Sequence, residues 1–124
     1  MKRIMLAVVL MASAALLAQP PSHHIDFTQP LIGFDNKPLI LPNATRPMTL
    51  GEAVVNALLT STPDDQKLSG VEKYKLDALA RKVYAAKDVE LSVEELATIK
   101  DRVGKVSTPI LVGAVWRILD PTEK

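Results

Sequence analysis

Repeated helix-start signals in the second half of the chain constrain its fold most strongly. Three of them place a Ser or Thr before a helix and a Glu three residues later, at Thr49–Glu52, Ser69–Glu72 and Ser92–Glu95. In such a capping box the hydroxyl and the carboxylate bond backbone N–H groups that the first helical turn leaves unpaired. Thr108 followed by Pro109 is a fourth start, because proline at the first helical position loses no hydrogen bond. We therefore expect helices near residues 50–60, 70–86, 93–105 and 109–119.

Apolar residues recur at helical spacing behind each start, which predicts one buried face per helix. The last segment differs, because apolar side chains surround it almost completely and leave Arg117 as its main polar position. We expect this segment to be the buried central element, ended by Asp120 and Pro121. Within it, Gly113 is expected to let a neighbouring element approach closely, with a hinge as the alternative. Trp116 is expected in the core, with an anchor in a partner's groove as the alternative.

The segment before the helices is rich in proline and contains short apolar pieces. Those on either side of residues 35–37 predict a β-hairpin, because Asp and Asn favour turns. Pro30, Pro38 and Pro42 confine its strands to edge or irregular positions. Two strands alone are only marginally stable in water, so this hairpin should pack on the helices. Residues 89–91 are a candidate third strand of the same sheet.

These patterns predict an α+β, mostly helical protein with about four helices packed as a small orthogonal bundle and an N-terminal β-hairpin. Residues 19–48 form the extended segment with the hairpin, residues 49–120 form the bundle, and residues 121–124 form a tail. The hairpin and the bundle are expected to make one domain, because neither shows the features of a separate core.

The first eighteen residues predict a secretory signal peptide. Met1, Lys2 and Arg3 precede an apolar run over residues 4–18 that contains no charged residue and only one polar one, Ser13; Gln19 and two prolines close it. The run is shorter than the roughly 20 residues that span a bilayer, so cleavage after Ala18 is favoured over anchoring. An uncleaved anchor and a misassigned start codon are the alternatives. A cleaved chain is expected to be periplasmic or secreted, and a misassigned start would make the protein cytoplasmic.

Charge and cysteine content exclude several classes of function. Removing Lys2 and Arg3 with the leader reduces the 15 basic residues to 13 against 14 acidic ones, a net charge of −1. This balance argues against a nucleic-acid partner, because such proteins neutralise phosphates with clustered Lys and Arg. The chain has no cysteine, so it has no disulfide, no thiolate zinc site and no thiol nucleophile.

Few residues are candidates for chemistry. The pair His23 and His24 has no third ligand nearby, so a solvated tail is favoured over a metal site. These are the only histidines, so a Ser-His-Asp arrangement would have to use a base from a mobile segment. The carboxylate pairs at residues 64–65 and 94–95 suit a solvated loop and a helical first turn. We predict no enzymatic activity, no cofactor and no metal.

Several segments resemble one group of known proteins. They are the hairpin from Asp26-Phe27 through residues 35–39, the start at Thr49-Leu50-Gly51 with residues 55–59, then residues 68–73, 79–84 and 89–92 with Glu95, and the apolar helix from Thr108-Pro109. From Ile25 to Asp120 the chain resembles small proteins encoded by temperate bacteriophages and prophages, mostly of unassigned role. The resemblance implies a phage-derived accessory protein and supplies no catalytic residues. Members of that group start near the position of Ile25 and carry no export leader, so this chain departs from them there.

The sequence therefore favours a protein that acts by contact. The expected second helix has a basic face with interleaved acidic residues, for which a solvated surface is the default interpretation. We predict contact with a protein partner, or self-association, through that helix and the hairpin, at Lys73, Arg81, Lys82 and Phe34. The alternative is an exported periplasmic domain that holds a small apolar ligand between its helices. A hydrolase with an unorthodox site ranks last, and membrane contact is expected only through an uncleaved leader.

Overall fold

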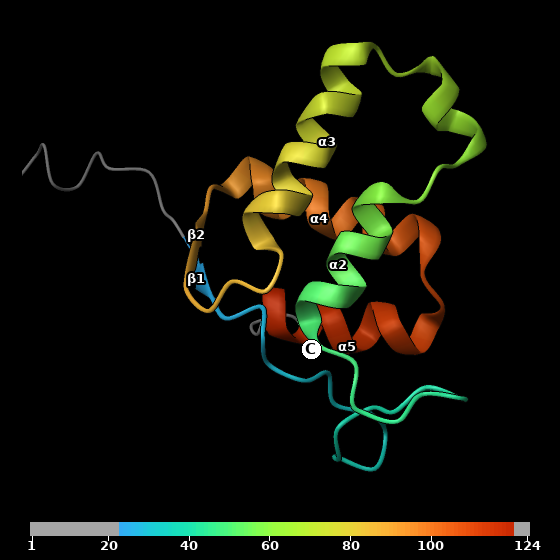
Figure 1. Ribbon diagram of the computed structural model, residues 1–124, viewed down its shortest axis with the longest axis vertical. Helices are drawn as coiled ribbons and strands as arrows, with labels where there is room; N and C mark the ends of the chain where they lie inside the picture. Colours follow the sequence, from blue (N-terminus) through green and yellow to red (C-terminus); the bar gives the residue numbers. More distant parts are fainter. Residues whose placement is uncertain (1–22, 121–124) are drawn as a thin grey trace, which may run out of the picture.

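A computed structural model describes residues 23–120 of the chain. In order, its elements are β1 (His23–Ile25), α2 (Leu50–Leu59), the 3-10 helix η1 (Pro63–Lys67), α3 (Gly70–Val83), β2 (Val89–Leu91), α4 (Val93–Val106) and α5 (Pro109–Leu119). Figure 1 shows α2 and α3 running across α4 and α5, with the short sheet at one side. The predicted α+β, mostly helical fold is confirmed. The predicted signal peptide and the tail lie outside the described residues.

The helices begin where the capping signals predict. The Oγ atoms of Ser69 and Ser92 each accept a hydrogen bond of 3.1 Å from the backbone N–H three residues later. Thr49 Oγ1 accepts the corresponding bond from Glu52 at 3.2 Å. The end of α3 comes earlier than expected, because Tyr84 is already extended and Ala85 takes a positive φ of 50°. Local capping therefore sets the helix starts, and the ends depend on the turns that follow.

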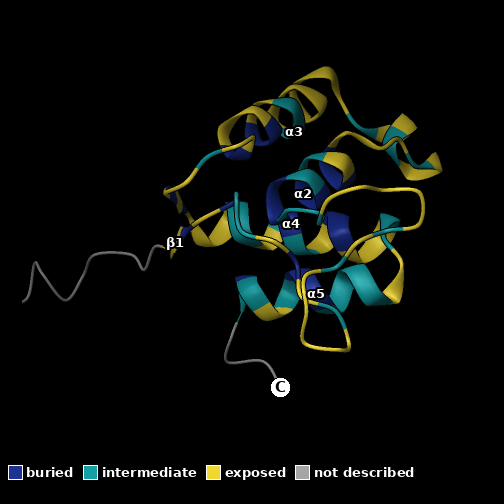
Figure 2. Ribbon diagram, turned by 60° about the horizontal axis from the view of Figure 1, so that its bottom comes forward, coloured by how far each residue is buried: buried dark blue, intermediate teal, exposed yellow. Residues whose placement is uncertain are grey.

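The central element is α2, so the expectation that the last helix occupies that place is wrong. Most residues of α2 are buried, and it contacts α3, α4 and α5 (Figure 2). In contrast, α5 buries Ala114, Val115 and Leu119 and leaves its other apolar residues partly exposed. The physical reason lies in the small side chains of α2, because Gly51, Ala53 and Ala57 let other segments approach its axis.

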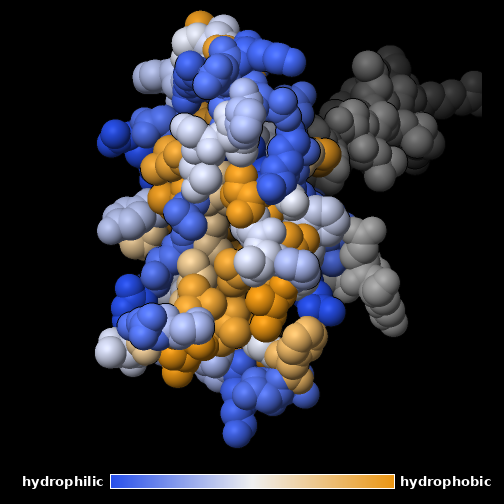
Figure 3. Space-filling model, turned by 90° about the vertical axis from the view of Figure 1, so that its right-hand side faces the viewer, coloured by the Kyte–Doolittle hydropathy of each residue, from blue (hydrophilic) through white to orange (hydrophobic). Residues whose placement is uncertain are grey.

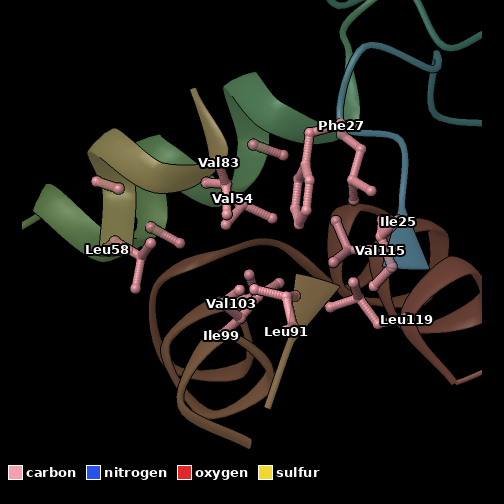
Figure 4. Packing of buried hydrophobic residues seen from close by; sticks show 14 of the residues in the cluster. Ile25, Phe27, Val54, Leu58, Val83, Leu91, Ile99, Val103, Val115 and Leu119 are labelled. Carbon is pink, nitrogen blue, oxygen red and sulfur yellow. The ribbon is translucent and has the colours of Figure 1, made fainter. Parts of the chain in front are cut away.

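One hydrophobic core joins α2, α3, α4 and α5. Figure 4 shows Val54 and Leu58 of α2, Val83 of α3, Ile99 and Val103 of α4, and Val115 and Leu119 of α5 directed into the same cluster. Ile25 and Phe27 from the N-terminal segment enter the same cluster, and Phe27 is completely buried. The extended segment and the helices thus share a single core.

The regular sheet differs from the predicted hairpin. β1 pairs with β2 in antiparallel register, with His23 opposite Leu91 and Ile25 opposite Val89. Residues 31–41 fold back on themselves as expected, but they form only an isolated bridge between Ile32 and Pro38. Proline lacks the backbone N–H that a ladder needs, which keeps this turn irregular. Residues 89–91 are a strand, as predicted, although their partner is β1 rather than the hairpin.

A close approach fixes the N-terminal segment to α2. The backbone N–H of Gly51 donates to Phe27 O at 2.8 Å, and the N–H of Phe27 donates to Ala86 O at 2.9 Å. A Cβ atom at position 51 would lie 2.9 Å from Phe27 O, so the contact requires glycine there. Within residues 23–120, no helix is long and apolar enough to cross a membrane.

Candidate interaction site

The histidine pair lies in β1 rather than in a solvated tail, which corrects the expectation for this segment. His24 Nδ1 is 3.0 Å from Asp88 Oδ1, and both side chains are well exposed. Residues 23–120 contain no group of three or more His, Cys, Asp or Glu side chains arranged to hold a metal ion. The pairing with Asp88 instead links β1 to the turn before β2.

The two carboxylates at positions 64 and 65 have different surroundings, and the interpretation of both as solvated is wrong for Asp65. Its Oδ1 and Oδ2 accept hydrogen bonds of 2.6 and 2.9 Å from the Arg102 guanidinium of α4. Its Oδ2 also accepts the backbone N–H of Thr62 at 2.8 Å. These bonds, first of all those from Arg102, hold the pKa of Asp65 well below its usual range.

Arg102 is the polar residue that the sequence patterns missed. Its side chain is almost fully buried, and besides Asp65 it donates to Thr60 O at 2.6 Å and to Ala57 O at 3.4 Å. It thereby joins α4 to the end of α2 and to η1. A signal for it exists, because Arg102 follows Ile99 by three positions and adjoins Val103 on the apolar face of its helix. Pairing and satisfied hydrogen bonds identify it as a structural residue.

Two of the three basic residues predicted for partner contact already have carboxylate neighbours. Arg81 Nε donates to Asp77 Oδ2 at 2.7 Å, and Lys82 Nζ donates to Glu95 Oε1 at 2.8 Å. Lys73, on the same helix, is exposed. In Figure 1, α3 and the segment over residues 31–41 lie at opposite ends of the molecule. The structure therefore does not bring Phe34 together with the basic residues of α3.

Phe34 projects from a turn that hydrogen bonds hold in place. Its side chain is 91% exposed. The Gly33 N–H donates to Lys37 O at 2.9 Å, and the Lys37 N–H donates to Asp35 Oδ1 at 3.1 Å. Asn36 takes a positive φ of 61°, a conformation that asparagine tolerates well. The aromatic ring is thus presented to solvent from a defined backbone position.

A groove of about 470 Å³ lies between this turn and one side of α5. We call it the α5 groove; most of its lining residues are apolar, although polar atoms expose nearly as much of its surface. The lining residues are Ile32, Gly33, Phe34, Asn36, Pro109, Ile110, Gly113, Ala114, Arg117 and Ile118. Figure 3 shows apolar side chains gathered in the lower half of one face, at the level of α5 and residues 31–48 in Figure 1.

Gly113 contributes to this groove, so the expectation that it lets a neighbouring element approach closely is wrong. A Cβ atom built at position 113 meets only Arg117 of its own helix, at 3.0 Å from Nη1. Arg117 is the single charged residue among those that line the groove. Within residues 23–120 no carboxylate forms an ion pair with it. An apolar recess with one available guanidinium suits a partner that offers an apolar side chain and a carboxylate.

Trp116 lies at the edge of the core and joins α5 to α4. Its ring packs close to Gly104, where a Cβ atom would lie 3.3 Å from Cζ2, and Lys100 Nζ lies 4.7 Å from the ring centroid. Its Nε1 is buried and has no hydrogen-bond partner among residues 23–120. Trp116 is thus a packing residue rather than part of the α5 groove.

Comparison of the chain with protein-family models, with curated proteins and with solved structures finds no match.

Proposed function

We propose that this chain is a non-enzymatic interaction protein that binds another protein chain through the α5 groove and Phe34. One observation carries the proposal, namely a phenylalanine that is 91% exposed on a fixed turn beside an apolar groove. Aromatic side chains seated in desolvated pockets contribute much of the affinity of protein interfaces. Because the turn is already ordered, little conformational entropy would be lost when Phe34 is buried by a partner.

The surroundings of the titratable groups support a role other than catalysis. Lowered pKa values belong to carboxylates that hold the fold together, as with Asp65 beside Arg102 and Glu52 beside Arg46. Glu95 similarly caps α4 and pairs with Lys82. Structural ion pairs of this kind perturb pKa values without any catalytic purpose.

Binding of a small apolar ligand between the helices has less support. Large side chains from α2, α3, α4 and α5 fill the space between these helices (Figure 4). The α5 groove lies at the surface beside an exposed turn, which suits a protein partner better than an enclosed ligand. Phage or prophage origin and export by the leader are parts of the proposal that rest on the sequence.

A photo-crosslinking experiment in cells tests the proposal. Replacement of Phe34 by the crosslinker p-benzoylphenylalanine should give a discrete covalent adduct with a protein chain. The same replacement at Tyr74, which is 73% exposed on α3, is the matched control and should give none. Gly113→Leu should reduce the adduct at position 34, because the new side chain would occupy the groove. Absence of an adduct at position 34, or equal adducts at both positions, would contradict the proposal.

A further inference from the structure

Building on the proposed function, we propose that the occupant of the α5 groove is a second copy of this chain. The two copies are related by a twofold axis, so that Phe34 of each enters the α5 groove of the other and Asp35 of each meets Arg117 of the other. In a twofold interface one surface patch contacts itself, so a projection and its recess must lie side by side on the same face. Phe34 satisfies this condition because it projects from the turn and also forms one wall of the groove.

Charge complementarity within this face argues for a second copy rather than an unrelated partner. Arg117 is the charged residue in the groove lining and has no carboxylate partner within residues 23–120. Asp35 is adjacent to Phe34 and exposed, and its Oδ1 accepts the backbone N–H of Lys37 at 3.1 Å. A carboxylate has more acceptor positions than that single bond uses. The chain thus carries, next to the projecting Phe34, the carboxylate of Asp35 that can pair with Arg117 of the groove. A twofold dimer forms this Asp35–Arg117 ion pair twice.

The apolar surface continues on the other side of Phe34. A second hollow there is lined by Phe34, Pro38, Leu39, Ile40 and Pro47, among others, and Ile40 is 54% exposed. Ile32, at the edge of the α5 groove, is 43% exposed. A copy seated on this face would therefore cover exposed apolar side chains on both sides of the Phe34 ring, in addition to the ring itself.

A charge-exchange series tests this arrangement by sedimentation equilibrium of the protein as the cell produces it. We expect a concentration-dependent dimer for the natural chain. Phe34→Ala, Arg117→Glu and Asp35→Arg should each raise the dimer dissociation constant about tenfold or more. The double variant with Arg117→Glu and Asp35→Arg restores opposite charges, so its constant should return to within about threefold of the natural value.

Lys73→Glu and Tyr74→Ala are the matched controls on α3, and their dissociation constants should be unchanged. Melting temperatures of all variants show whether a loss of dimer reflects unfolding. A natural chain that is monomeric at about 1 mM, or a double variant no tighter than the single ones, would overturn the self-association. If the crosslink at position 34 then joins a different protein, the proposed function stands and only this inference fails. If no crosslink forms either, both fail.

Discussion

Among single residues, Arg102 connects segments that are far apart in the sequence, because it bonds Asp65 of η1 and the carbonyl groups of Ala57 and Thr60. We expect Arg102→Met to lower the free energy of unfolding by about 3 kcal/mol, since it leaves a carboxylate and two carbonyl groups without their donor. Urea unfolding measures this change. Arg81→Met, which removes an exposed pair with Asp77, is the control and should change stability by less than about 1 kcal/mol. Equal effects would contradict the role assigned to Arg102.

The same ion pair predicts how stability depends on pH. The pKa of Asp65 is lower in the folded protein than in the unfolded chain, mainly because Arg102 donates to it. The pair therefore contributes fully above about pH 4 and is lost as the pH falls toward the folded pKa. Between pH 5 and pH 3 the natural protein should lose more stability in urea titrations than Asp65→Asn does. If stability falls equally with pH in the two proteins, Asp65 is not responsible for the loss of stability at low pH.

Sequence patterns identify exposed residues such as Phe34 better than buried polar residues such as Arg102. The exposure of Phe34 is predictable because it stands beside turn-forming residues that keep it at the surface. The bonds of Arg102 depend on where α2 ends relative to α4, which no local pattern encodes. The α5 groove is equally hidden, because it combines a turn near residue 34 with a helix that begins at residue 109.

At the scale of helices and strands, α2 and α3 use glycine at their starts for different reasons. A Cβ atom at position 51 would lie 2.9 Å from Phe27 O, whereas one at position 70 meets nothing within 4 Å. We expect Gly51→Ala to destabilise the protein by about 2 kcal/mol. Gly70→Ala should stabilise it by about 0.5 kcal/mol, because alanine loses less backbone entropy. Thermal unfolding of the two variants shows whether each substitution lowers or raises stability. A stabilising Gly51→Ala would contradict the close approach of Phe27 O to position 51.

Helix starts were predictable because the signals lie within four residues of one another, as in Ser69 with Glu72 and Ser92 with Glu95. The sheet was only partly predictable. Strand character at residues 89–91 is a local pattern, but its pairing with β1 joins segments separated by three helices. The place of α2 at the centre also depends on packing, because its small residues become informative only when the neighbouring elements are known.

At the scale of the whole molecule, the helices depend on the segment before them. Ile25, Phe27 and Leu31 are buried against them, and the N–H groups of Leu50 and Gly51 donate to carbonyl groups of residues 29 and 27. Loss of a buried phenylalanine alone costs about 3 to 5 kcal/mol, a large share of the stability of a small domain. A chain beginning at Thr49 should therefore lack a cooperative transition in urea followed by Trp116 fluorescence.

The full-length variant Tyr74→Ala is the control for that truncation, because its side chain is exposed on α3 and lies outside the core. It should unfold cooperatively at a midpoint close to that of the natural protein. A truncated chain with a sharp transition and native helix content would show instead that the helices fold without the N-terminal segment.

Pairing of β1 with β2 sets a condition on biosynthesis. A ribosome makes His23 long before Leu91, so the first strand has no partner until the turn between α3 and α4 has left the exit tunnel. Contacts between such distant segments also form slowly, because a long loop must close first. Folding of this end therefore runs against the order of synthesis, and a nascent chain that stalls before Leu91 would expose an unpaired strand edge to other chains.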